Sequence, residues 1–306
     1  MNAVDIKINH ITKDYGQNRG VFDLNFELRR GEIFGFVGTN GSGKTTTIRQ
    51  IMGFIKPNNG HIDIRGLDAY KDATETKKFI GYVPGEISFP DLPTGISFIK
   101  SQAEFLKLKD LSYANELIKI FQIDLRANPR KMSKGMKQKT AVIAALMNDA
   151  DILLLDEPTT GLDPLMRKLF LEVLEKEKAK GKTILISSNI FEEIEALCDR
   201  VALIKDGKII DIAVMEEIRN PIKREYKIEF NNKDDFEKFK LENIEIVRIK
   251  EEQNQVIVKI NKEEYNSFFK TLTKYNLKFI NENKYNLEKY FKEKFNRLER
   301  DGENHD

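Results

Sequence analysis

A glycine-rich stretch that ends in a lysine and two threonines, residues 38–46, carries the clearest chemical signal in the sequence. An apolar run at 33–37 predicts a buried strand before it, and a predicted helix at 45–52 follows it. Glycine lets a backbone curl so that successive N–H groups, with the start of a helix, point at phosphate oxygens. Lys44 would reach the β- and γ-phosphates, and the Thr45 hydroxyl would contact a magnesium ion. The predicted phosphate-binding residues are Gly38, Asn40, Gly41, Ser42, Gly43, Lys44, Thr45 and Thr46.

Two carboxylates close a second apolar run, residues 152–155. A buried strand that ends in Asp156 and Glu157 places Asp156 where it can hold magnesium, directly or through water. Glu157 would then orient or deprotonate an attacking water molecule. A solvated acidic turn is the alternative for this pair alone, but the glycine-rich stretch favours a catalytic site. Together the two motifs predict a P-loop NTPase.

Two further features are ambiguous on their own. Ser133 begins a predicted helix that runs to residue 147, so its hydroxyl and the N–H of Gly135 form either an anion site or a simple helix cap. Tyr15 lies upstream of the predicted strand that leads into the P-loop. It is either a stacking platform for a nucleotide base or a tyrosine of a turn. The pattern at Tyr15 alone favours the turn.

The surrounding elements predict how these residues are positioned. Alternating apolar residues at 4–8 and 22–28 predict antiparallel strands, and helical periodicity begins at 94 and marks a helical insertion at about 94–148. From residue 151 a strand, a helix, a strand and a helix follow one another, which predicts a parallel sheet. A hairpin is expected at Asp206 and Gly207. This is an α/β fold with a mixed sheet, an antiparallel β subdomain and a helical insertion.

A change in composition after Pro221 predicts a second domain. Of 18 glycines only Gly302 lies beyond this point, and the tail is rich in Lys, Glu, Asn and Phe. Its pattern is strand, helix, two strands, helix and strand, a split βαβ order, followed by an amphipathic helix at 286–300. We therefore expect a nucleotide-binding domain at 1–220 and a small α+β accessory domain at 221–306.

Composition limits the cellular location and the classes of partner that we expect. Charged residues form 33% of its 306 residues, and its apolar runs are too short to cross a bilayer. The first residues lack the pattern of a secretory signal, so we expect synthesis to end in the cytoplasm. The single cysteine, Cys198, excludes an internal disulfide. A formal charge of +2 gives little support to nucleic-acid binding, and no nucleic-acid partner is expected.

The motifs together resemble, in order and spacing, the ATP-binding subunits of ABC transporters, over residues 1 to about 220. They lie at 38–45, 133–137, 152–157, 161–163 and 187–189. The resemblance implies that two ATP molecules, with Mg²⁺, are sandwiched between two nucleotide-binding domains, with Ser133 and Gly135 acting on the site of the partner. It further implies that Tyr15 stacks on adenine, that Asp163 lies in the loop that links the two sites, and that Glu157 is the catalytic carboxylate.

Three motifs depart from the commonest pattern of that family. Lys134 and Lys137 occupy the third and fifth positions of the signature, a form that resembles exporters of drugs and bacteriocins. Gly85 stands where a glutamine is expected, and Glu86 is the candidate to take over its magnesium contact. Asn189 replaces the switch histidine; its amide donates a hydrogen bond but cannot carry a proton. The loss of a γ-phosphate contact would cost about 10²-fold or more in rate, so we predict slow but real hydrolysis.

These observations favour an ATPase subunit of a membrane exporter. It would lie on the cytoplasmic face of the membrane and pair with a second nucleotide-binding domain, which we expect to be a second copy of the chain. It would drive a separately encoded membrane permease. The alternatives are a soluble ABC-type ATPase that acts on ribosomes or DNA, and a slowly hydrolysing module whose main output is ATP-dependent dimerisation. The second domain is either regulatory or dimer-stabilising, or an accessory domain without a separate task.

Overall fold

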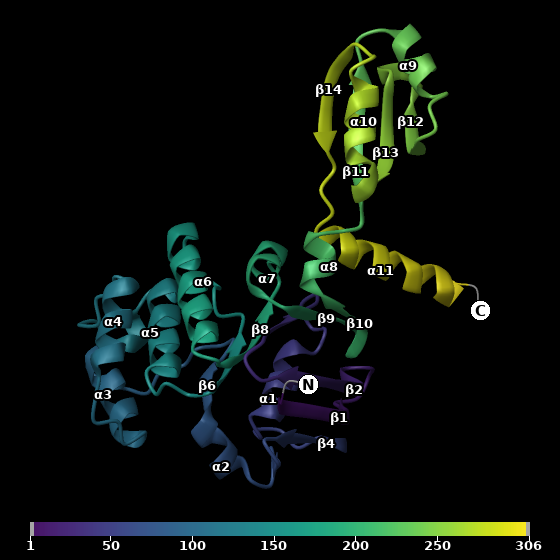
Figure 1. The fold of residues 1–306 in the computed structure, drawn as a ribbon. Helices are drawn as coiled ribbons and strands as arrows, with labels where there is room; N and C mark the ends of the chain where they lie inside the picture. Colours follow the sequence, from purple (N-terminus) through teal and green to yellow (C-terminus); the bar gives the residue numbers. More distant parts are fainter. Residues whose placement is uncertain (1–2, 304–306) are drawn as a thin grey trace. The chain divides into compact units, whose positions relative to one another are not determined.

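The computed structural model describes residues 3–303 and their side chains as far as residue 296. The chain forms two compact units, Met1–Val214 and Met215–Asp306 (Figure 1). The boundary expected from composition, after residue 220, lies six residues later. The difference is the short helix α8 (Met215–Arg219), which belongs to the second unit and which the composition of the tail did not indicate.

A six-stranded mixed sheet forms the centre of the first unit. Its order is β10-β9-β3-β8-β7-β6, parallel throughout except for β10, which pairs antiparallel with β9. The strands are β3 (Ile33–Val37), β6 (Ile80–Val83), β7 (Ile152–Asp156), β8 (Thr183–Ser188), β9 (Arg200–Lys205) and β10 (Lys208–Val214). Every residue of β3, β7 and β8 is buried, as continuous apolar runs in a covered parallel sheet require. The predicted parallel sheet and hairpin are confirmed.

An antiparallel sheet of order β2-β1-β4-β5 packs against the same core. Its strands are β1 (Val4–Asp14), β2 (Gly20–Arg29), β4 (Asn59–Ile64) and β5 (Leu67–Asp68). The alternating residues Ile6 and Ile8 of β1 point into this core, where Ile48 and Ile51 of helix α1 (Lys44–Ile51) also pack. The sequence predicted two of these strands and the sheet that they form.

Asp5 joins the two sheets at the edge opposite the P-loop. Its buried carboxylate accepts hydrogen bonds from Nε of Arg65 (2.8 Å), Nε of Arg30 (3.0 Å) and Oγ1 of Thr183 (2.6 Å), at the start of β8. Burial alone would raise the pKa of Asp5, but these three donors lower it below its ordinary value of 3.8. The carboxylate is therefore held in its charged form.

Helices cover the remainder of the first unit. The helical insertion contains α3 (Gly95–Phe105), α4 (Ser112–Ile120) and α5 (Lys134–Leu146), which lie together in Figure 1. Thr94 begins α3, because its Oγ1 accepts the N–H of Ser97 at 3.1 Å. The other helices of the unit are α2 (Ala73–Thr76), α6 (Pro164–Ala179) and α7 (Phe191–Leu197). Among the described residues, no helix combines the length and the apolar character needed to span a bilayer.

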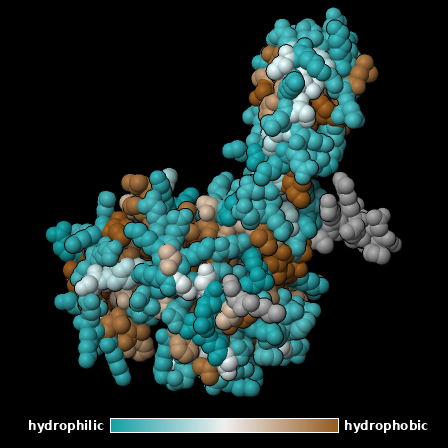
Figure 2. Space-filling model, in the orientation of Figure 1, coloured by the Kyte–Doolittle hydropathy of each residue, from teal (hydrophilic) through white to brown (hydrophobic). Residues whose placement is uncertain are grey.

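The second unit has the β-α-β-β-α-β order that its sequence predicted, with an antiparallel sheet of order β12-β13-β11-β14. Aromatic residues of both helices, such as Phe236 and Phe268, pack with β11 and β13 in a core of its own. A terminal helix, α11 (Leu287–Glu303), follows. The other elements are β11 (Lys223–Phe230), α9 (Lys233–Phe239), β12 (Glu245–Lys250), β13 (Gln255–Asn261), α10 (Tyr265–Leu272) and β14 (Leu277–Glu282). On the face that Figure 2 shows, hydrophobic residues are scattered among hydrophilic ones in both units.

Candidate nucleotide site

The predicted site residues follow four neighbouring strands of the central sheet. Strands β3, β8, β7 and β6 are parallel neighbours, so their carboxyl ends meet at one edge. Val37 is paired with Ser188, and Asp156 with Ser187. The P-loop, Asn189, Glu157 and Gly85 follow these strands in that spatial order. Ligands of open α/β sheets bind at this edge.

The P-loop has the backbone of a phosphate cradle. Gly43 precedes α1 with φ +111°, a conformation that other residues rarely adopt, and a Cβ there would lie 2.5 Å from Cγ1 of Val21. Thr45 and Thr46 lie half-buried in the first turn of α1, and Asn40 is exposed at the loop. Ser42 is buried, and its Oγ has no hydrogen-bond partner among the described residues. An orphaned buried hydroxyl at a helix start suits a phosphate acceptor.

The side chain of Lys44 folds back onto the loop that precedes this residue. Its side chain is 5% exposed, and Nζ donates hydrogen bonds to the carbonyl oxygens of Gly38 (2.9 Å) and Thr39 (3.2 Å). Nζ also lies 3.7 Å from Oε1 of Glu157. Burial lowers the pKa of Lys44, while Glu157 and Asp156 oppose that shift. The ammonium group of Lys44 is thus placed between the phosphate cradle and the carboxylates of Asp156 and Glu157.

Asp156 presents one free oxygen to the site. The residue is fully buried, and Oδ1 accepts a hydrogen bond from Oγ of Ser187 at 2.7 Å. Oδ2 has no partner among the described residues. A Cβ at Gly85 would lie only 2.9 Å from Oδ2, so glycine leaves room beside it. A buried carboxylate oxygen without a hydrogen-bond partner fits a divalent cation, bound directly or through water.

The backbone at Glu157 adopts a left-handed conformation, with φ +47°. Its N–H donates to both the carbonyl oxygen (3.1 Å) and Oγ (3.0 Å) of Ser187. Non-glycine residues hold this conformation only where their surroundings impose it, and such residues cluster at active sites. Ser187 therefore holds the carboxylate of Asp156 and the backbone of Glu157 at the end of β7.

Comparison with known proteins decides the family. The family model described as ABC transporter matches residues 21–160. The bacitracin transport ATP-binding protein BcrA of Bacillus licheniformis is 36% identical over 236 residues, which cover 74% of this chain and 76% of that protein. The chain belongs to the ABC transporter ATP-binding proteins.

Other members of this ABC family agree with the assignment. The ABC transporter ATP-binding protein NatA of Bacillus subtilis is 36% identical over 65% of this chain and 84% of its own length. A Nod factor export ATP-binding protein I from Cupriavidus pinatubonensis is 36% identical over 67% of this chain and 65% of that protein. Among solved structures, an ATP-binding subunit of an ABC transporter has a TM-score of 0.65 at 29% identity, covering 70% of this chain and 91% of that chain. A dimeric bacterial ABC transporter cassette has a TM-score of 0.62 at 25% identity, covering 69% of this chain and 98% of that chain.

The residues that the ABC resemblance assigned to a partner site begin helices. Oγ of Ser133 accepts the N–H of Met136 at 3.3 Å and caps α5. Gly135 approaches the carbonyl oxygen of Gly161 closely. Oδ1 of Asp163 accepts the N–H of Met166 at 2.9 Å and caps α6. Helix α5, which Ser133 caps, lies with α3 and α4 and apart from α1, the helix that follows the P-loop (Figure 1).

Three further candidates are exposed. Tyr15 lies in the turn between β1 and β2, is 49% exposed, and has Nζ of Lys13 at 5.7 Å from its ring centre. Asn189 and Glu86 are exposed directly after β8 and in the loop after β6. An exposed aromatic near the P-loop strands is available to a base, but a turn tyrosine has the same geometry.

Sequence reasoning missed one residue near the ABC site, Glu193 of α7. Its carboxylate is buried and accepts hydrogen bonds from Oγ1 of Thr159 (2.8 Å) and Oγ of Ser188 (3.1 Å). Burial raises its pKa, which these two donors and Arg167 oppose. The available signal was its place beside Ile194 and one turn before Leu197, on the apolar face of a predicted helix.

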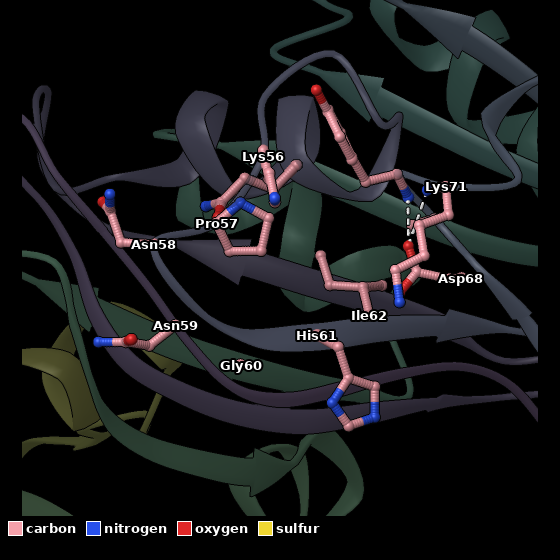
Figure 3. Close-up of a pocket in the computed structure, with 12 residues that line it drawn as sticks. Lys56, Pro57, Asn58, Asn59, Gly60, His61, Ile62, Asp68 and Lys71 are labelled. Carbon is pink, nitrogen blue, oxygen red and sulfur yellow. Dashed lines mark hydrogen bonds and ion pairs between the residues drawn. The ribbon is translucent and has the colours of Figure 1, made fainter.

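A separate hollow of about 450 Å³ lies at the other end of α1 (Figure 3). The carboxylate of Asp68 there accepts the N–H groups of Tyr70 (3.0 Å) and Lys71 (2.8 Å), drawn as dashed lines. Its other lining residues include Gln50, Lys56, Asn58 and His61. None of them is a predicted nucleotide contact, so this hollow is distinct from the site at the P-loop.

Proposed function

We propose that this chain is the ATP-hydrolysing subunit of a membrane exporter, which binds Mg-ATP between two nucleotide-binding domains and drives a separately encoded permease. The observation that carries this proposal is the meeting of Lys44, Asp156 and Glu157 at the carboxyl ends of β3 and β7, on one edge of the central sheet. Relatives named for bacitracin transport and Nod factor export support an exporter.

In this proposal the chain's own groups bind and orient the nucleotide. The loop N–H groups and Lys44 bind the phosphates, and Tyr15 stacks on the adenine. Thr45 and Asp156 hold Mg²⁺, with Glu86 as a further contact; the bound ion neutralises phosphate charge. Glu157 orients or deprotonates the attacking water, with its backbone fixed by Ser187.

The second half of the site comes from a second copy of the chain. Ser133 and Gly135 offer a helix start to the γ-phosphate bound by the partner, and Asp163 contacts the opposite site. The separation of α5 from α1 supports this arrangement, as does the likeness to a dimeric ABC cassette. The assembly lies at the cytoplasmic face of the membrane, on the permease.

Turnover in this proposal is slow. Asn189 donates a hydrogen bond to the γ-phosphate but carries no proton, and Gly85 supplies no side chain to the metal. Each change weakens a contact that positions the reacting groups, and the loss of the γ-phosphate contact costs about 10²-fold or more in rate. Asn189 also favours a second candidate function, in which nucleotide-dependent dimerisation is the main output and hydrolysis only resets it.

Comparison of the native chain with Glu157→Gln tests the function. We expect Mg-dependent ATP hydrolysis in the native chain, a loss of about 10²-fold or more in the variant, and an ATP-bound dimer that accumulates in the variant. Glu192→Gln, a change at an exposed position of α7, is the control and keeps native activity. Equal hydrolysis by Glu157→Gln and the native chain would contradict the assignment of Glu157.

A further inference from the structure

One buried carboxylate touches three separate segments of the nucleotide-binding unit. Glu193 is 3% exposed, and its Oε2 accepts hydrogen bonds from both Thr159 and Ser188. Its Oε1 lies 3.1 Å from Nε of Arg167, on α6. Burying a carboxylate is costly unless it is paired, so these contacts hold the three segments in one arrangement.

Each of the three segments carries a candidate site residue. Thr159 lies two residues after Glu157 in the turn that follows β7, where the N–H of Thr160 donates to the carbonyl oxygen of Glu157 at 3.2 Å. Ser188 precedes Asn189, and its Oγ also accepts the N–H of Ile190 at 3.0 Å. The hydrogen bond therefore joins the two residues on either side of Asn189.

Arg167 belongs to the first turn of α6. Its N–H donates to the carbonyl oxygen of Asp163 at 2.9 Å, which ties the arginine to the residue that caps this helix. Asp163 is the residue expected to face the second copy. Glu193 therefore lies between the surface for the partner and the two loops of the catalytic site.

The contact to Arg167 is the weakest of the three. Its charged groups are close, yet Nε of Arg167 and Oε1 of Glu193 both lack a hydrogen bond of good geometry among the described residues. The two bonds to Oε2 are well formed by comparison. A displacement of α6 would thus strengthen or break the ion pair before it disturbed the two loops.

We propose that Glu193 is a positioning residue. When the Asp163 segment contacts a second copy of the chain, Glu193 passes the effect of that contact to the loops that hold Glu157 and Asn189. It acts through Thr159 and Ser188 and does not touch the nucleotide. This inference rests on the proposed function, in which two copies share the site.

The variant Glu193→Gln separates the hydrogen bonds of Glu193 from its ion pair with Arg167. Its amide oxygen still accepts the bonds from Thr159 and Ser188, but the negative charge that faces Arg167 is gone. We expect kcat for ATP to fall about 10-fold or more, because small misplacements of catalytic groups have effects of this size. KM for ATP stays within about twofold of the native value, since the P-loop is untouched. Glu192→Gln, one residue away and exposed, stays native in both.

A double-mutant cycle checks the coupling to α6. Arg167→Gln alone also lowers kcat, and its combination with Glu193→Gln loses less than the sum of the two single effects. Thr159→Val, which removes one donor without changing volume much, lowers kcat and serves as the test if Glu193→Gln does not fold.

The outcomes distinguish this inference from the proposed function. If hydrolysis depends on Glu157 but Glu193→Gln and Thr159→Val keep kcat within twofold of native, the positioning role is wrong and the ATPase assignment stands. If the native chain shows no hydrolysis that depends on Glu157, the ATPase assignment is wrong. ATP-dependent dimerisation is then the readout, and equal dimer affinity of the native chain and Glu193→Gln overturns the positioning role.

Discussion

Nζ of Lys44 lies 3.7 Å from Oε1 of Glu157, although the two residues follow strands that are not adjacent. Strand β8 lies between β3 and β7, and both side chains reach across its end. The lysine and the carboxylate therefore belong to one half-site within a single chain. In the proposed dimer Ser133, at the start of α5, belongs to the other half.

This division predicts complementation between two inactive variants. Lys44→Ala damages the phosphate cradle, and Ser133→Glu places a negative charge where the partner's γ-phosphate would lie. Each variant alone is expected to be inactive. In a heterodimer one site receives both defects and the other receives neither. An equal mixture should therefore recover about a quarter of native sites.

The ATPase rate of the mixture, measured against each variant alone, checks this prediction. Recovery requires subunit exchange, which size-exclusion chromatography of differently tagged chains verifies. No recovery in a mixture that contains verified heterodimers would mean that Ser133 does not act on the partner's site.

Asn189→His is expected to raise kcat by about 10-fold, because a histidine can both donate to the γ-phosphate and carry a proton. The pH profile should gain a limb near the ordinary histidine pKa of about 6.5. Asn189→Ala, which removes the donor, should fall below the native rate. Native-like rates for both variants would show that residue 189 does not contact the reacting phosphate.

Gly85→Ala is expected to increase the Mg²⁺ concentration needed for half-maximal hydrolysis by about 10-fold. The added Cβ would lie 2.9 Å from Oδ2 of Asp156 and must displace the carboxylate or close the space beside it. Glu86→Gln tests the neighbouring candidate ligand in the same titration. A normal Mg²⁺ requirement in Glu86→Gln alone would leave Asp156 and Thr45 as the metal-binding residues.

Asp5→Asn is expected to lower the stability of the first unit by about 3 kcal/mol at pH 7, because two arginines lose a buried charged partner. The folded pKa of Asp5 is depressed, so its stabilisation is fully present above its unfolded value of 3.8 and is lost as pH falls through the folded pKa. Urea unfolding of both chains at a series of pH values should show the difference shrinking below pH 3.8. Asp91→Asn, at an exposed ion pair, is the control and should cost much less at every pH.

The parallel sheet of the nucleotide-binding unit was predictable from the sequence because several of its strands are continuous apolar runs that alternate with helical patterns. Residues 152–156 and 183–188 have no competing helical periodicity, and Gly38, Gly41 and Gly43 mark the turn that follows the strand at 33–37. The split βαβ order of the second unit was predictable for the same reason. Its boundary was less so, since α8 has no feature of composition that assigns it to either unit.

The fine structure of the site could not be predicted. The left-handed backbone of Glu157 results from two hydrogen bonds to Ser187, a residue that only the parallel pairing of β7 and β8 brings alongside. Glu193 gave no motif, because its partners come from three segments that are distant in sequence. Such contacts depend on tertiary packing, which local patterns do not encode.

The position of β8 has a consequence for the timing of the proposed ATPase cycle. Ladders of backbone hydrogen bonds, rather than loops, set the separation of the P-loop from Glu157, two strand spacings or about 10 Å. This separation stays the same when the helical insertion or the second unit moves. In the proposed cycle each chain therefore carries its half of the site at a fixed spacing, and the meeting of two chains completes it.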